Sequence, residues 1–416
     1  MPSKIIAPRS DESSDRDRIV EEAIRQIASL GVRGATLRSV AAGSGCTLAG
    51  IVTLFGTKDG LIAECFREVV RRDREYLAAL AGEAAAMAIG PELAGPFLWT
   101  LCEEASGGRR ADMLVLVELW VSAPSHPHFA PICIDWLRAR RDALRSLAGH
   151  FGVAPMAFDL LGLHLLSESV FAVSCHSSPA YRLIARGGFM EACVRLAGLG
   201  HQEAHAAIEV TADHFYAEPD HVPANDDDGG EGRGAEGRAR IVDAAAVIIE
   251  RDGFAAVTNR AVADQAGVSV ALTGYHFKSV AELAVAGIVR VFEKTNANVR
   301  RDAKPAGAAS FAKGIGDAPH RTGVGQLASR GMAEISLVAA RSPALAFLGL
   351  AMRRQRGTVT YASLGGDRSG ISRTTAASHA LWSSATLLIQ SVPGEEGLYD
   401  FGAQARVMAK AMFDLS

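Results

Sequence analysis

The feature that most constrains the fold is a stretch that occurs twice in the chain. The two copies span 18–61 and 240–283, and they align without a gap at one constant offset. Gly31 of the first copy pairs with Gly253 of the second, and Gly45 pairs with Gly267. Because self-similarity at a fixed separation is the signature of a repeated structural unit, we expect two copies of one small domain.

Each copy is predicted to form three helices. In the first copy an apolar stripe at helical spacing begins at Ile19, and Gly31 ends that helix because glycine tolerates the left-handed conformation. Thr36 and Thr47 are placed as N-caps of two short helices separated by a tight turn at Gly45. Such a pair forms a helix-turn-helix, whose second helix can enter the major groove of DNA.

Both copies resemble the DNA-binding domain of the tetracycline-repressor (TetR) family. The second copy follows that family's pattern at Asp-Gly-Phe (252–254), Thr258-Asn259-Arg260, Ala-Gly-Val-Ser (266–269) and Tyr-His-Phe (275–277). The first copy is more diverged, with Leu-Gly-Val (30–32), Thr36-Leu37-Arg38, Ser-Gly-Cys-Thr (44–47) and Leu54-Phe55, then Lys58. The resemblance implies that each head is followed by a helical body with a ligand pocket and a dimerisation face.

Composition favours a soluble, all-α, cytoplasmic protein. Hydrophobic residues make up 49% of the 416, alternating apolar runs are scarce, and the formal charge of −3 provides no global attraction to nucleic acid. The six cysteines include no Cys-x-x-Cys pair, so we expect neither a disulfide framework nor a zinc ribbon. No signal peptide is evident, and the most apolar run, 160–175, is expected to be too short to span a membrane.

The chain is expected to consist of two TetR-like units in tandem. The predicted segments are a disordered tail (1–15), a first head (16–61), a first body (62–217), a flexible linker (218–237), a second head (238–283) and a second body (284–416). Helices are expected at 61–87, 97–105, 111–122, 129–149, 156–176, 181–198, 201–216, 281–300, 325–341, 344–363, 372–391 and 396–414.

Weak matches suggest that the repeat continues through the bodies. His164 matches His379 at an offset slightly smaller than the one that relates the paired glycines of the heads. A duplicated unit with two heads is expected to form an intramolecular pseudo-dimer whose late helices pack as two subunits would. The alternative is that two chains pair and present four heads.

The resemblance places DNA contacts on both heads. Arg38 and Arg260 are candidates for a guanine edge or a phosphate, with a plain surface arginine as the alternative. Caps at helix N-termini can also bind phosphate through the backbone. The full predicted set is Thr36, Arg38, Thr47, Leu48, Thr53, Lys58, Thr258, Arg260, Ser269, Tyr275, His276 and Lys278.

The recognition helices depart from the family pattern. The segments 46–54 and 268–276 contain no Lys or Arg, and Leu48 and Val270 stand where the family usually has a polar or basic residue. Basic and acidic residues nearly balance, six to five over 15–60 and five to five over 238–282. Few phosphate ion pairs imply modest affinity. The first head is therefore either a weak reader, with Leu48 and Thr53 against thymine methyls, or a structural remnant.

Apolar and ionisable residues of the bodies are candidates for an effector pocket, with ordinary helical core as the alternative. The predicted set is Trp99, Cys102, Glu118, Trp120, Trp136, His164 and Glu168 in the first body, and Met332, Met352, His379 and Trp382 in the second. The resemblance implies a small, largely apolar effector. A buried carboxylate such as Glu118 or Glu168 needs a partner.

No cofactor, metal site or enzymatic activity is predicted. The histidine pairs 126/128 and 201/205 have no third ligand nearby, and phosphate-loop and catalytic-serine motifs are absent. The leading hypothesis is a ligand-responsive transcriptional repressor that reads a two-half-site, double-stranded operator. The alternative is a ligand-sensing or partner-binding helical protein whose heads have lost operator binding.

Overall fold

The computed structural model describes residues 10–199, 211–216, 233–302, 324–366 and 371–413, and every element within those ranges is helical. This confirms the all-α prediction for the described chain. The first head consists of α1 (Ser10–Gly34), α2 (Leu37–Ser44) and α3 (Leu48–Phe55). Gly31 interrupts α1 as expected, with φ 76° and ψ 169°, and a short helical segment follows as far as Gly34.

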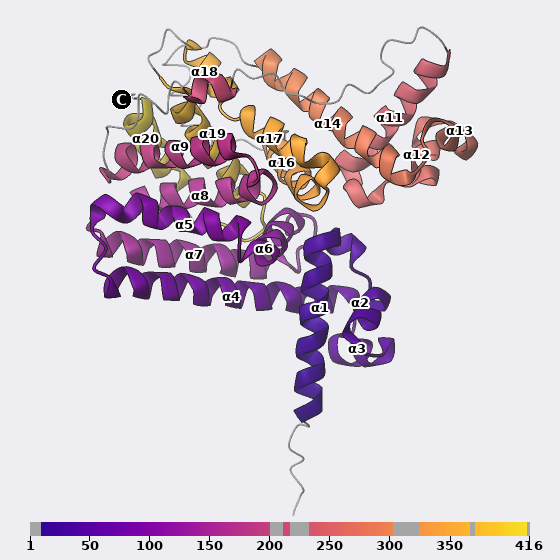
Figure 1. The fold of residues 1–416 in the computed structure, drawn as a ribbon, viewed down its shortest axis with the longest axis horizontal. Helices are drawn as coiled ribbons and strands as arrows, with labels where there is room; N and C mark the ends of the chain where they lie inside the picture. Colours follow the sequence, from indigo (N-terminus) through magenta and orange to yellow (C-terminus); the bar gives the residue numbers. More distant parts are fainter. Residues whose placement is uncertain (1–9, 200–210, 217–232, 303–323, 367–370, 414–416) are drawn as a thin grey trace, which may run out of the picture.

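The first body is a stack of long helices. They are α4 (Lys58–Ala86), the short η1 (Pro91–Leu93), α5 (Ala94–Ser106), α6 (Arg110–Ser122), α7 (Ala130–His150), α8 (Pro155–Cys175) and α9 (Pro179–Ala197). In Figure 1, α4, α5, α7 and α8 run side by side, and α6 lies between them and the head. The helix α1 packs against both α4 and α6.

The described part of the second half is also helical. Its head comprises α11 (Arg233–Asp252), η2 (Phe254–Ala256), α12 (Asn259–Ala266) and α13 (Val270–His276). Its body comprises α14 (Val280–Asp302), α16 (Val324–Arg341), η4 (Pro343–Leu345), α17 (Ala346–Arg354), α18 (Thr358–Ser363), α19 (Arg373–Gln390) and α20 (Phe401–Phe413). In Figure 1 both heads lie at the right-hand end of the molecule, the first below and the second above.

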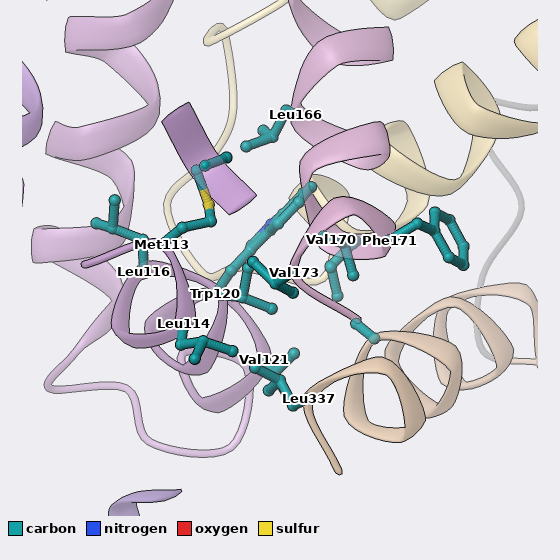
Figure 2. Close-up of a cluster of buried hydrophobic side chains, with 14 of the residues drawn as sticks. Met113, Leu114, Leu116, Trp120, Val121, Leu166, Val170, Phe171, Val173 and Leu337 are labelled. Atoms are coloured by element: carbon teal, nitrogen blue, oxygen red, sulfur yellow. The ribbon is translucent and has the colours of Figure 1, made fainter. Parts of the chain in front are cut away.

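The two halves share one core. The helix α8 packs against α16, α17 and α19 of the second half, and α9 packs against α19 and α20. Figure 2 shows part of this core, where Trp120 of α6, Val173 of α8 and Leu337 of α16 lie together. These side chains are at most 3% exposed. The stabilising apolar burial of each half therefore depends on the other half.

Several expected boundaries differ from the structure. The segment 344–363 is two helices rather than one, because Gly357 adopts φ 84° and turns the chain between α17 and α18. The last helix begins at Phe401 rather than at 396. The helix α1 already includes 10–15 of the expected tail, and Arg16, next along it, forms an ion pair with Glu64 at 2.6 Å.

The expected linker, 218–237, and helix, 201–216, lie partly outside the described residues. Residues 233–237 are already helical at the start of α11, and 211–216 are helical as expected. The helix boundaries elsewhere agree with the expected ranges to within about three residues, which is close to the ordinary uncertainty of helix ends.

The helix α8 corrects the expectation that the most apolar run is too short to cross a membrane. It has 21 residues and is long and apolar enough by composition, but 89% of its apolar window is buried inside the protein. Its neighbours are helices on several sides, α5, α7, α9 and α19 among them. A helix surrounded by other helices is apolar all round, so its position in the core accounts for its composition.

Candidate functional site

The first head has the geometry of a helix-turn-helix. The hydroxyl of Thr36 accepts a hydrogen bond from the Ser39 amide at 3.1 Å, and the Ser39 hydroxyl accepts one from the Thr36 amide at 3.0 Å. Gly45 makes the turn with φ 70°, and Thr47 caps α3 by accepting from the Gly50 amide at 3.0 Å. The axes of α2 and α3 meet at 111°.

The second head repeats these caps at the matching positions. Thr258 accepts from the Ala261 amide at 3.1 Å, Gly267 makes the turn with φ 66°, and Ser269 accepts from the Leu272 amide at 3.2 Å. Since the caps fix where each short helix begins, the two heads present their third helices, α3 and α13, in the same local way.

Residues 241–286 match the family model of bacterial regulatory proteins, tetR family. This segment is therefore similar to a TetR-type DNA-binding domain. It covers most of α11, all of α12 and α13, and the start of α14. The match supports a DNA-binding transcriptional regulator of the TetR family. No curated protein matches the chain.

The TetR-type domain exposes the predicted DNA contacts of α12 and α13. Tyr275 is 81% exposed, and Lys278 and Arg260 are also exposed. Val270, which is not among the predicted contacts, is 49% exposed. His276 is half-buried, and its ring lies 5.1 Å from that of Tyr275. Buried side chains such as Thr273 and Phe277, at most 2% exposed, pack in the interior of the domain.

The first head presents a similar surface. Arg38 is exposed, Leu48 is 44% exposed and Val52 is 45% exposed. The Thr53 hydroxyl donates to the Ala49 carbonyl at 2.9 Å and remains at the surface. Neither Arg38 nor its counterpart Arg260 has a hydrogen-bond or ion-pair partner within the described part of the chain, so both guanidinium groups are available to a ligand.

Lys58 is placed differently from the other predicted contacts. Its ammonium group donates to the Arg33 carbonyl at the end of α1, at 3.2 Å, and the residue is half-buried. Burial lowers the pKa of the Lys58 ammonium group. The side chain therefore stabilises the junction between α1 and α4, and contact with a phosphate would have to compete with that bond.

A second-half arginine links the first head to the bodies. Arg341, the last residue of α16, donates to the carbonyls of Ile27 and Ala28 in α1, both at 3.0 Å. It also donates to the carboxylate of Glu118 in α6 at 2.8 Å, while the other Glu118 oxygen accepts from the Val32 amide at 3.0 Å. Glu118 thus joins α6 to the end of α1, and each of its carboxylate oxygens accepts a hydrogen bond from the protein.

The tryptophans predicted for a pocket pack as core. Trp120 and Trp136 are each 1% exposed, with ring centroids 6.2 Å apart at 77°. The Trp136 indole donates to Asp73 at 2.9 Å, and Asp73 also pairs with Arg140 at 2.8 Å and Arg109 at 2.9 Å. Burial opposes ionisation of Asp73, but the two guanidinium groups outweigh it and lower the pKa of the carboxyl.

Glu168 has its partner in the other half. Its carboxylate is 0% exposed and accepts from Arg353 of α17 at 3.0 Å and from the Tyr181 hydroxyl at 2.9 Å. His164 lies one turn away, with Nε2 4.0 Å from a Glu168 oxygen. Burial lowers the pKa of His164 to about 4, against the opposing attraction of Glu168, so the ring is neutral at physiological pH.

The second body has the same kind of packing. The Trp382 indole is 0% exposed and donates to Gln404 at 3.1 Å. His379 lies 5.6 Å from Trp382, and Met352 is 1% exposed, whereas Met332 is only partly buried. Sequence reasoning placed Trp382 and His379 together, but it missed the partners Arg341, Arg353 and Tyr181. Arg341 and Arg353 lie far along the chain from Glu118 and Glu168, and nothing in a single sequence identifies partners at such separations.

Trp99 and Cys102, two of the pocket candidates, line an open cleft. The cleft has a volume of about 280 Å³ and lies between α5, α8 and α9. Burial raises the pKa of the Cys102 thiol, so this cysteine remains protonated. The six cysteines are all free thiols, and the described residues contain no group of three or more potential metal ligands.

Proposed function

We propose that the chain is a two-headed transcriptional regulator that acts as an intramolecular pseudo-dimer. The observation that carries this proposal is the packing of α8 and α9 against α19 and α20, one pair from each half. A second buried contact reinforces it, in which Glu191 of α9 accepts from Thr375 of α19 at 2.6 Å. In the proposal the segments 16–61 and 238–283 are the heads and the segments 62–217 and 284–416 are the bodies.

The proposed target is a double-stranded operator with two unequal half-sites. Each head supplies one unpaired arginine, Arg38 or Arg260, at matching positions, and capped helix N-termini that can hold phosphate. The exposed apolar residues of α3 and α13, Leu48 and Val270, suit thymine methyl groups. One covalent chain allows the two heads to differ, so the operator need not be palindromic. Release by a small effector, and hence repression, completes the proposal.

The test is a gel shift with the DNA upstream of the gene for this protein. Wild type, Arg38→Ala and Arg260→Ala would be compared at two salt concentrations, because phosphate contacts weaken as salt rises. Arg138→Ala is the matched control, since Arg138 is an exposed arginine of α7. Specific retardation that both head variants lose, and that the control keeps, would support two reading heads.

Other outcomes have equally definite meanings. Loss with Arg260→Ala alone would make the first head structural. The absence of retardation at low salt, together with no enrichment in a genome-wide pull-down, would contradict operator binding.

A second candidate function is a ligand sensor or partner-binding protein without operator binding. The observation that favours it is that α3 and α13 contain no Lys or Arg and expose apolar side chains instead. The same pull-down, analysed for bound protein as well as DNA, separates the two functions.

A further inference from the structure

The cleft between α5 and α9 combines an apolar floor with a cationic rim. Trp99 and Cys102 of α5 and Tyr181 of α9 form the floor and are at most 5% exposed. Arg182 and Arg186, one helical turn apart on α9, form the rim and are exposed. The volume of about 280 Å³ is just below the usual range for small-molecule sites, about 300–1,000 Å³, so the cleft suits a small ligand.

The two rim arginines are free to bind a ligand. No hydrogen bond or ion pair joins either guanidinium group to another side chain in the part of the chain that the structure describes. Glu103 of α5 also lines the cleft, so the rim carries two cations against one anion before His176 is counted. An arginine without a carboxylate partner, placed above an aromatic floor, suits an anion with an apolar body.

We propose that this cleft binds a small organic carboxylate with an aromatic or aliphatic body. The carboxylate pairs with Arg182 and Arg186, and the apolar body lies on Trp99 and Ala172. This inference rests on the proposed function in one respect: it gives the chemical class of the effector. Binding to the cleft itself does not require DNA.

The cleft has a direct connection to the contact between the halves. The Tyr181 hydroxyl that borders the cleft donates to Glu168, and Glu168 pairs with Arg353 of the second half. On the other side, the Val173 carbonyl, next to Ala172, accepts from Arg110 of α6 at 3.0 Å. A bound carboxylate that displaces Tyr181 would therefore disturb the ion pair that joins the halves, and with it the spacing of the heads.

The probe for this site is 2-naphthoate, with 2-naphthamide as its uncharged counterpart. Binding to the full chain would be measured by isothermal titration calorimetry, without DNA, for wild type, the double variant Arg182→Gln/Arg186→Gln and the control Arg138→Gln. We expect saturable binding of one naphthoate per chain. The affinity should fall about tenfold or more in the double variant, which lacks the guanidinium donors, and for the amide, which lacks the carboxylate acceptor.

Equal affinity for naphthoate and naphthamide, or an unchanged affinity in the double variant, would overturn the proposal. So would full competition by inorganic phosphate at equal concentration, since it would mean that the rim holds any anion. Both rim residues are exposed, and unchanged circular dichroism and melting temperature would establish that the variants fold. A gel shift with and without naphthoate is then read separately, so a failure of DNA binding leaves the calorimetric result intact.

Discussion

Glu168 joins the two halves through an ion pair with Arg353. It is completely buried, and its two oxygens are satisfied by Arg353 and Tyr181 from two different helices. Arg353 itself is 2% exposed and also donates to the Tyr216 hydroxyl at 2.8 Å. A buried charge is costly without its partner, whereas a complete network is tolerated.

Replacement of Glu168 by Gln should lower the free energy of unfolding by about 3–5 kcal/mol, because Arg353 is left buried without a counter-ion. Urea unfolding followed by circular dichroism measures this. The double variant Glu168→Leu/Arg353→Met should recover much of the loss, since it removes both charges together. Glu75→Gln, at the exposed pair with Arg71, should cost less than about 1 kcal/mol. A loss of unfolding free energy in Glu168→Gln as small as that in the control variant would contradict the prediction.

His164 should make the chain sensitive to acid. Its folded-state pKa is about 4, whereas an unfolded histidine has a pKa of about 6.5. Between these values the unfolded chain binds a proton that the folded chain does not, so the free energy of unfolding falls as the pH is lowered from about 6.5 to about 4. The full contribution is about 3 kcal/mol.

The measurement is the urea midpoint as a function of pH for wild type and His164→Gln. The variant should lose less stability over this interval, and the exposed-histidine variant His176→Gln should behave like wild type. Parallel profiles for wild type and His164→Gln would show that the buried ring does not contribute to the pH dependence of stability.

At the scale of elements, the first head contacts helices of both halves, whereas the described contacts of the second head are mainly with its own body. The helix α1 packs against α4, α6 and α16, and Arg341 binds carbonyls near its end. The second head packs chiefly through α11 on α14 of its own body. Carbonyls near a helix C-terminus lack intrahelical partners and interact favourably with cations, which explains why an arginine lies there.

Arg341→Gln should loosen the end of α1 without unfolding the bodies. Loss of charge-assisted bonds to Ile27, Ala28 and Glu118 should raise amide exchange over 27–34 about tenfold, as expected for about 1.4 kcal/mol. Hydrogen exchange read by mass spectrometry reports this, with Arg138→Gln as the unchanged reference. Unaltered amide exchange over 27–34 would show that Arg341 does not stabilise the end of α1.

The sequence predicts the local structure of the heads well because their signals are local. A capping threonine and a turn glycine act within a single helical turn, so Thr36, Gly45 and their counterparts can be identified directly. The division of 344–363 by Gly357 was missed because an isolated glycine is also compatible with a helix. Close packing requires glycine at 357, since a Cβ there would lie 2.5 Å from the Ala377 backbone nitrogen.

The site residues of the bodies were harder to predict. Buried carboxylates at 118 and 168 were expected to need partners, but those partners, Arg341 and Arg353, belong to the second half of the chain. Only the packing of one half on the other brings them together. The cleft on α9 was anticipated in part, through Trp99 and Cys102, whereas Arg182 and Arg186 have no distinguishing pattern in the sequence.

At the scale of the whole molecule, the proposed pseudo-dimer places within one chain the kind of interface that joins the subunits of a dimer. The helices α8, α9, α19 and α20 bury their shared surfaces inside one polypeptide. A covalent link keeps the two halves at a high effective concentration, so association with a second chain is not needed to bring two heads together.

The protein should therefore be a monomer that binds one DNA duplex per chain. Light scattering coupled to size exclusion should give a mass of 43.7 kDa for the free protein, and titration against a long operator fragment should saturate at equal molar amounts. A dimer, with two chains on each duplex, would instead support the four-headed alternative.

The pairing of Glu168 with Arg353 also determines how this molecule responds to mutation. At the offset that relates His164 to His379, Glu168 corresponds to Ser383, and Arg353 corresponds to the exposed Arg138. The bond therefore occurs once, whereas a contact across a symmetric dimer axis occurs twice. In a homodimer a substitution is present in both subunits, so its cost in stability at the axis occurs twice. Here each position occurs once per molecule, so a substitution can change one side of the contact between the halves while the other side stays constant.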